Sequence, residues 1–156
     1  MVAKCLFYIF TDQLAELLPK LCPNVIDMNL DHAELTDAGV RVLSLGFKDL
    51  TRLNLDYNDI TNESLRALGE NCKALSYVSL KAILEITDEG VNFLIDHCPN
   101  LVYLNVSFTS CTAGLVEKMK VKRPNLIIER QMRPARLVPA RKKSSKNKNT
   151  TSKAKK

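Results

Sequence analysis

Residues 47–68, FKDLTRLNLDYNDITNESLRAL, contain the pattern that decides the fold. Leu50, Leu53 and Leu55 alternate with polar residues, as in a short strand that buries one face. The Thr61 side chain can then accept an unpaired backbone N–H at the start of a helix. Apolar residues follow this threonine by four and seven positions, which is the helical spacing. The stretch therefore predicts one unit of strand, turn and helix.

This unit recurs along the chain at a nearly constant interval. The threonines are separated by 25, 25, 26 and 25 residues, and a second landmark at the end of each helix repeats with the same spacings. The threonines are Thr11, Thr36, Thr61, Thr87 and Thr112, and the second landmark is Cys22, Phe47, Cys72, Cys98 and Arg123. The inward helix pairs are Val40 with Leu43, Leu65 with Leu68, Val91 with Leu94, and Val116 with Met119. A single unit cannot bury its apolar face, whereas stacked units can.

The repeats resemble a known family most closely in one unit. Residues 98–106, Cys-Pro-Asn-Leu-x-x-Leu-x-Val, preceded by Ile-Thr-Asp-Glu-Gly-Val at residues 86–91, resemble the cysteine-containing leucine-rich repeat. That repeat occurs in F-box leucine-rich-repeat proteins and in antagonist-of-mitotic-exit proteins. Over residues 10–128 the resemblance implies an α/β leucine-rich-repeat solenoid, a short horseshoe arc with parallel strands on the concave face and helices on the convex face. It also implies a protein–protein interaction module and, more specifically, substrate recognition in an SCF-type ubiquitin-ligase pathway, with ligase components among the partners.

The predicted domain division follows from the charge distribution. Residues 1–129 hold 12 Lys/Arg and all 17 Asp/Glu, a net charge of −5, and are predicted to form about four full repeats with partial repeats at both ends. Residues 130–156 hold 11 Lys/Arg and no acid, and are predicted to be a disordered basic tail. The first strand of the pattern falls at Met1, so we expect no F-box segment ahead of it and no direct docking to the ligase adaptor.

The basic tail has three possible roles, of which two are functional and one is only to keep the protein in solution. Two basic clusters about ten residues apart predict a nuclear import signal, comprising Arg141, Lys142, Lys143, Lys153, Lys155 and Lys156. The alternatives are weak, salt-dependent contact with nucleic acid and a solubilising terminus.

Three interpretations are open for the N-terminal segment at residues 6–10, LFYIF. It covers the first repeat, it docks on another protein, or the chain is a truncated product of a longer gene. Cytoplasmic or nuclear localisation is expected.

The cysteines are predicted to be core residues. Cys22, Cys72 and Cys98 lie whole repeats apart, whereas zinc needs ligands that converge on one atom. Phe and Arg take the same place in other units, which fits packing and does not fit metal binding. The run at residues 6–10 is too short for a secretory leader or a membrane span, so free thiols are expected, with disulfides between stacked cysteines as the alternative. No nucleotide-binding glycine loop and no G-x-S-x-G motif occurs. We therefore predict no enzyme activity, no cofactor, no metal and no membrane association.

The strand pattern also identifies the residues that should face a partner. Side chains that alternate with the buried leucines point outward on the concave face, where leucine-rich repeats bind. Tyr77 and Tyr103 should lie side by side on adjacent strands, and tyrosine is enriched at interface hot spots. Asp31 and Asp56 should form an acidic edge able to meet a basic segment. The complete predicted face is Asp27, Asn29, Asp31, Arg52, Asn54, Asp56, Tyr77, Ser79, Lys81, Tyr103, Asn105 and Ser107.

Overall fold

Strands and helices alternate throughout the computed structural model, which describes residues 2–3 and 11–132. The strands are β1 (Val2–Ala3), β2 (Asp27–Asn29), β3 (Arg52–Asn54), β4 (Tyr77–Ser79), β5 (Tyr103–Asn105) and β6 (Ile127–Glu129). The helices are α1 (Asp12–Leu21), α2 (Asp37–Gly46), α3 (Asn62–Asn71), α4 (Asp88–His97) and α5 (Ala113–Lys122). The predicted import residues and the tail from residue 133 onward lie outside the described residues, as does the segment at residues 4–10.

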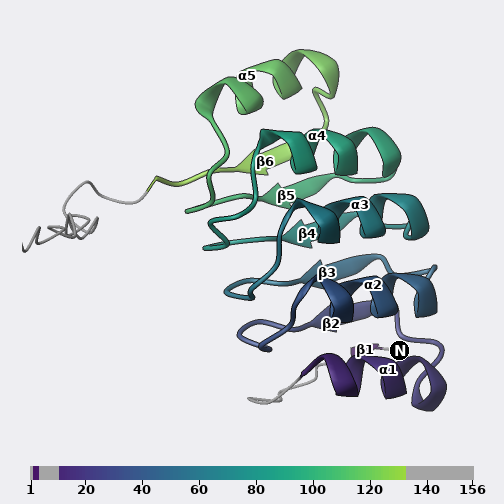
Figure 1. Cartoon of the computed structure of the whole chain (residues 1–156). Coiled ribbons are helices and arrows are strands. Elements are labelled where there is room, and N and C mark those ends of the chain that lie inside the picture. Colours follow the sequence, from purple (N-terminus) through teal and green to yellow (C-terminus); the bar gives the residue numbers. More distant parts are fainter. Residues whose placement is uncertain (1, 4–10, 133–156) are drawn as a thin grey trace, which may run out of the picture.

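The strands form one parallel sheet in the order β1-β2-β3-β4-β5-β6. Each helix connects two neighbouring strands, so the strands stack as one layer and the helices as a second layer beside it (Figure 1). Such connections suit parallel strands, because the chain must return to the same end of the sheet before it enters the next strand. The predicted leucine-rich-repeat solenoid is confirmed, and we call its two surfaces the strand face and the helix face.

The core runs between the two layers from the first described helix to the last unit. Leu50, Leu53 and Leu55 are 1%, 2% and 0% exposed, and the equivalent residues of the other full units are buried with them. Cys72 and Cys98 are both 0% exposed, so the prediction that they pack in the core is confirmed. One continuous apolar cluster therefore links every repeat to its neighbours.

The helix starts are tied together across repeats by a ladder of side chains. The residue after each threonine accepts hydrogen bonds from the backbone N–H and the hydroxyl of the next threonine, as Asp12 does from Thr36 at 3.0 and 2.6 Å. The further rungs are Asp37 to Thr61, Asn62 to Thr87, and Asp88 to Thr112. Asn62 differs in that its amide donates to the Thr87 hydroxyl. The ladder fixes the offset between successive helices, and it was not predicted.

The threonine side chain caps three of the described helices and makes no cap bond in two, those that begin after Thr11 and Thr87. Thr36 and Thr61 accept from the backbone N–H groups of Ala38 and Glu63, as expected. The prediction for Thr87 was wrong: its side chain makes no cap bond. Its hydroxyl is held by the Asn62 amide instead.

The last unit departs from the pattern in two further ways. Leu115 and not Val116 faces the core with Met119, so the predicted inward pair was wrong by one residue. In addition, Ile128 pairs with Leu104, because this unit reaches its strand one residue earlier than the others. The partial repeat expected at this end therefore differs from the full repeats in the shorter loop before its strand.

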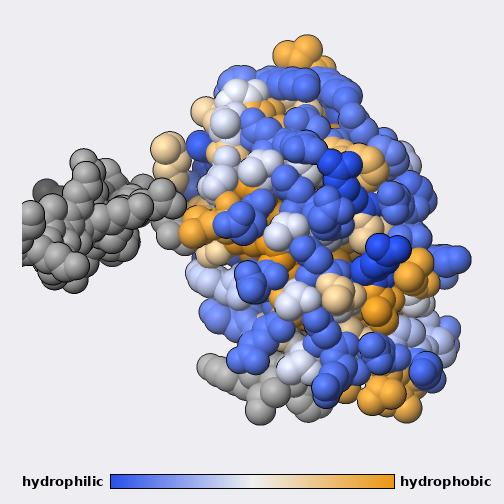
Figure 2. All heavy atoms as spheres, in the orientation of Figure 1, coloured by the Kyte–Doolittle hydropathy of each residue, from blue (hydrophilic) through white to orange (hydrophobic). Residues whose placement is uncertain are grey.

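The helix face is mainly hydrophilic. In Figure 2 blue dominates the surface drawn, and orange appears in separate areas. Among the described residues, no helix has the length and apolar character needed to cross a membrane.

Candidate binding face

Strand register arranges the predicted binding residues in rows across the sheet. The tyrosine row comprises Asp27, Arg52, Tyr77, Tyr103 and Ile127, which are partners in consecutive strand pairs. The amide row comprises Asn29, Asn54, Ser79, Asn105 and Glu129. The rim row, two residues further along each unit, comprises Asp31, Asp56, Lys81 and Ser107. All twelve predicted residues thus occur in these rows.

The tyrosine row contains the most ordered contacts of the strand face. The rings of Tyr77 and Tyr103 stack with centroids 4.5 Å apart and an interplanar angle of 3°. The Arg52 guanidinium carbon lies 4.3 Å from the centroid of the Tyr77 ring, and its Nε lies 3.4 Å from a carboxylate oxygen of Asp27. These interactions hold a charged group and two rings in one continuous strip. The expected side-by-side placement of the two tyrosines is confirmed.

Glu129 fixes the far end of this strip. The Tyr103 hydroxyl donates to a Glu129 carboxylate oxygen at 2.5 Å. Loss of solvent around the ring, together with this acceptor and its negative charge, raises the pKa of Tyr103 above its usual value. The hydroxyl therefore stays protonated at neutral pH and keeps its ring in place.

The amide row presents hydrogen-bond donors. The side-chain oxygens of Asn29, Asn54 and Asn105 accept from the backbone N–H two residues later, at 3.2, 2.9 and 2.9 Å. Each side chain has one amide oxygen and one amide nitrogen, so this contact leaves the nitrogen for other partners. Within the described part of the chain, these three nitrogens donate no hydrogen bond. A partner can supply the acceptors.

Two predicted contact residues are unavailable. Ser79 and Ser107 are 3% and 1% exposed, contrary to the expectation that they face solvent. The Ser79 hydroxyl donates to Asp56 at 2.6 Å, and the Ser107 hydroxyl accepts from the Gln131 backbone N–H at 3.1 Å. Both side chains therefore serve contacts between units.

The predicted acidic edge is also partly internal. Asp56 accepts from the Ser79 hydroxyl and from the Lys81 backbone N–H at 2.7 Å. Burial raises the pKa of Asp56 despite these two hydrogen bonds, and the charge of Asp31 adds to the increase. Asp31 is exposed, with its carboxylate 2.7 Å from the His32 ring. Only Asp31 of this pair presents a freely accessible carboxylate.

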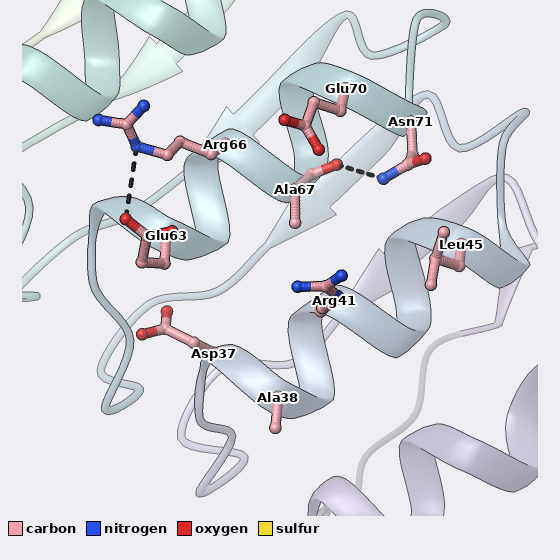
Figure 3. Close-up of a pocket in the computed structure, with 9 residues that line it drawn as sticks. All are labelled: Asp37, Ala38, Arg41, Leu45, Glu63, Arg66, Ala67, Glu70 and Asn71. Carbon is pink, nitrogen blue, oxygen red and sulfur yellow. Dashed lines mark hydrogen bonds and ion pairs between the residues drawn. The ribbon is translucent and has the colours of Figure 1, made fainter.

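Two hollows adjoin these surfaces. A shallow one of about 190 Å³ lies on the strand face, lined by Asp27, Met28, Asn29, Arg52, Leu53, Asn54 and Tyr77. A larger one of about 520 Å³ lies on the helix face between α2 and α3 (Figure 3). In Figure 3 the α3 side of this hollow is engaged within its own helix, by the ion pair of Arg66 with Glu63 and by the Asn71 amide that donates to the Ala67 carbonyl. The hollow on the strand face adjoins the stacked tyrosines, which makes that face the better candidate.

The recurrent cysteines have a structural role. The Cys72 thiol donates to the Ser44 and Phe47 carbonyls at 3.6 Å, and the Cys98 thiol to the Cys72 carbonyl at 3.5 Å. Burial raises the pKa of Cys72 to about 12 and that of Cys98 to about 11, so both thiols are protonated and unreactive at neutral pH. Among the described residues, no group of three or more His, Cys, Asp and Glu side chains could hold a metal ion.

One further row of side chains, exposed at His32 and Tyr57 and half-buried at Ala82 and Phe108, was not predicted. His32, Tyr57, Ala82 and Phe108 occupy equivalent positions immediately after the rim row, each with a positive φ angle. None of them is Gly or Asn, the residues that usually signal this backbone conformation. The fixed offset of these residues from the strands could have grouped them from the sequence alone. It could not have predicted their positive φ angles.

Comparison with known proteins supports the same architecture. A model of the family described as Leucine Rich repeat matches residues 48–69. One chain of the crystal structure of the Rad7–Elc1 complex in yeast superposes with a TM-score of 0.65 and 26% identity, covering 77% of this chain and 30% of that chain. Internalin C2 from Listeria monocytogenes superposes with a TM-score of 0.51 and 23% identity, covering 77% and 49% respectively. The chain thus spans less than half the length of either structure. With the repeat spacing and the parallel sheet, these matches show that the chain has the leucine-rich-repeat fold.

Proposed function

We propose that this protein is a protein–protein interaction module that binds an extended segment of a partner across its strand face. The leucine-rich-repeat fold is generally a binding scaffold, because stacked repeats present an extended surface. The observation that carries the proposal is the stacked pair of Tyr77 and Tyr103. Paired rings that are already fixed lose little conformational entropy on binding, and tyrosine often contributes most of the energy of an interface.

The chemistry of the strand face defines what it can bind. Apolar side chains of the partner would cover the two rings and Ile127, which is 64% exposed. Backbone carbonyls or carboxylates of the partner would accept from the amide nitrogens of Asn29, Asn54 and Asn105. The shallow hollow beside Tyr77 would take one short side chain.

The test is recovery of partners by the full chain and by the double variant Tyr77→Ala/Tyr103→Ala, followed by quantitative mass spectrometry. We expect at least about a tenfold loss of the partners that bind the strand face, the magnitude of a typical hot spot. The matched control is Leu45→Ala/Val121→Ala, which removes two side chains of the helix layer that are 53% and 87% exposed. Equal recovery by the double variant, with an unchanged urea midpoint, overturns the proposal.

We further propose that the partner belongs to a ubiquitin-ligase pathway. This rests on the resemblance of the repeats to those of F-box leucine-rich-repeat proteins, and similarity to a chain of the Rad7–Elc1 complex agrees with assembly into a complex. Ligase components should then be enriched among the proteins lost from the tyrosine double variant. Their absence from that set argues against the pathway and leaves the interaction module intact.

A second candidate function is suggested by the charge separation in the sequence. The segment from residue 130 onward carries 11 Lys/Arg and no Asp/Glu, so it can contact phosphates of nucleic acid or act as an import signal. Nucleic-acid binding that falls steeply with salt and disappears on deletion of residues 139–156 would support the first role. A nuclear fraction unchanged by the same deletion removes the second.

A further inference from the structure

The edge of the sheet beyond the strand ends carries a regular row with an unusual backbone. His32, Tyr57, Ala82 and Phe108, the left-handed row, have φ angles of 56°, 58°, 63° and 62°. This conformation costs a residue with a Cβ roughly 1–2 kcal/mol. Each backbone N–H in the row donates to a carbonyl of the next unit, at distances from 2.8 to 3.0 Å. The bonds between repeats therefore fix the backbone from which these side chains project.

Three side chains of this row carry rings and form an aromatic strip, which is exposed at His32 and Tyr57 and half-buried at Phe108. The rings of His32 and Tyr57 stack with centroids 4.2 Å apart and an interplanar angle of 17°. Tyr57 is 45% exposed, and the His32 side chain is 58% exposed. A pair of rings that remains this accessible offers an apolar face to a partner.

The rings of the strip already attract a cation within the chain. The Lys81 ammonium nitrogen lies 5.7 Å from the centroid of Tyr57 and 5.9 Å from that of Phe108. Ala82 has no ring, so the ammonium group occupies the space between the two aromatic residues. Such distances are those of a cation held by ring faces. At the opposite end of the strip, the His32 ring stacks on Tyr57 and has no Lys or Arg side chain over it among the described residues.

Acidic residues surround that uncovered part. Asp31, Glu34 and Asp59 are exposed in the two loops that carry His32 and Tyr57, and Asp56 is half-buried between them. Neither loop, at residues 31–35 or 56–60, contains Lys or Arg. Negative potential beside ring faces attracts a basic side chain and repels the phosphates of a nucleic acid.

We propose that the left-handed row and its flanking carboxylates form a docking surface for a lysine- and arginine-rich segment of a partner protein. One basic side chain of the partner would lie over the His32 ring, at the end of the strip that Lys81 does not cover. Neighbouring basic residues would pair with Asp31 and Asp59. The surface lies beyond the ends of the strands that carry the tyrosine row, and the inference does not depend on that row.

The test uses the full chain and a fluorescent 16-residue peptide of alternating Lys and Ser, with an alternating Glu–Ser peptide as the probe control. Fluorescence anisotropy at low salt should show saturable binding of the Lys–Ser peptide only. Asp31→Asn/Asp59→Asn should weaken this binding about three- to tenfold, since two exposed ion pairs are removed. Tyr57→Ala should weaken it about two- to fivefold, and Tyr57→Phe should retain it because the ring remains.

Matched variants separate this surface from general charge attraction. Glu16→Gln/Glu70→Gln removes two exposed carboxylates from the helix face and should leave binding unchanged. Equal weakening by that pair overturns the proposal, as does full binding by Asp31→Asn/Asp59→Asn.

Peptide binding that appears only after Arg141, Lys142 and Lys143 are replaced by Ser would identify the chain's own C-terminal segment as the occupant and overturn the assignment to a partner. Tyr77→Ala/Tyr103→Ala should leave binding of the Lys–Ser peptide unchanged. Failure of this docking proposal can therefore be distinguished from failure of the strand-face proposal.

Discussion

Asp37 carries a large part of the contact between the helix starts of two repeats. Its carboxylate accepts four hydrogen bonds, from the backbone N–H and hydroxyl groups of both Thr61 and Ser64. Burial alone would raise the pKa of Asp37, but the bonds from Ser64 and Thr61 outweigh it and lower the pKa. Ionised Asp37 is therefore more favourable in the folded chain than in the unfolded chain.

Replacing Asp37 tests this linkage. Asp37→Ala should reduce the free energy of unfolding by about 2–4 kcal/mol at pH 7, because four donors lose a charged acceptor. Since the folded-state pKa lies below the unfolded value, the stabilisation is complete above about pH 4 and is lost as the pH falls through the folded value. Urea unfolding at pH 7 and at pH 3 should show the gap between wild type and variant narrowing with acid. Asp49→Ala, at an exposed site, is the control, and an Asp37→Ala variant as stable as wild type at pH 7 contradicts the role.

Residue-level prediction from the sequence succeeded where the repeat spacing alone decides the outcome. Tyr77 and Tyr103 are 26 positions apart, so equivalence in the repeat made them strand neighbours. Ser79 could not be predicted as buried, because its burial depends on Asp56 of the preceding unit. Asn58 was also missed: it is 7% exposed, and its amide donates to three backbone carbonyls of two loops. Only the folded arrangement shows that those carbonyls converge.

The ends of α2, α3 and α4 are each held by one side chain from the next unit. Cys72 and Cys98 donate their thiols to carbonyls of the preceding repeat. Arg123 takes the same place and donates to three carbonyls, those of Ile95, Pro99 and Leu101, at 3.0, 2.9 and 2.9 Å. The departure from the cysteine pattern in the last unit therefore preserves the function of the position. The sequence showed the substitution, but not that thiol and guanidinium both donate to carbonyls at the end of the preceding repeat's helix or in the residues after it.

The start of α4 limits the size of one residue whereas the start of α5 does not, so a glycine from each helix provides a matched test. A Cβ at Gly90 would lie 2.3 Å from the Asn62 side-chain oxygen, whereas the nearest atom to a Cβ at Gly114 is 3.5 Å away. Gly90→Ala should lower the free energy of unfolding by about 1–3 kcal/mol, because Asn62 cannot move without losing its bonds to Thr87. Gly114→Ala should raise it by about 0.5–1 kcal/mol through helix propensity. Urea midpoints of the two variants provide the measurement, and stabilisation by both would show that the contact at Gly90 imposes no limit.

Stability should vary along the whole solenoid, because each repeat contacts only its neighbours. Helices α3 and α4 pack closely: a Cβ at Gly69 of α3 would lie 3.1 Å from the Phe93 ring and 3.2 Å from the His97 Cβ of α4. Helix α5 makes little contact with α4 and leaves Val121 87% exposed. The repeat spacing predicted the order and direction of all these elements, because it sets which units are neighbours. It did not predict the weaker attachment of α5 to α4.

Hydrogen exchange can measure this gradient. Amides of α3 and α4 should exchange most slowly and those of α5 faster, since local opening follows the packing of each unit. Arg123→Ala should speed exchange in α5 and β6 at least about tenfold, because three carbonyls lose their donor, and should leave α3 unchanged. Lys120→Ala, which removes only the exposed ion pair with Glu117, is the control. Equal acceleration in α3 and α5 would show that the solenoid opens as one cooperative unit, contrary to the neighbour-by-neighbour stability proposed for it.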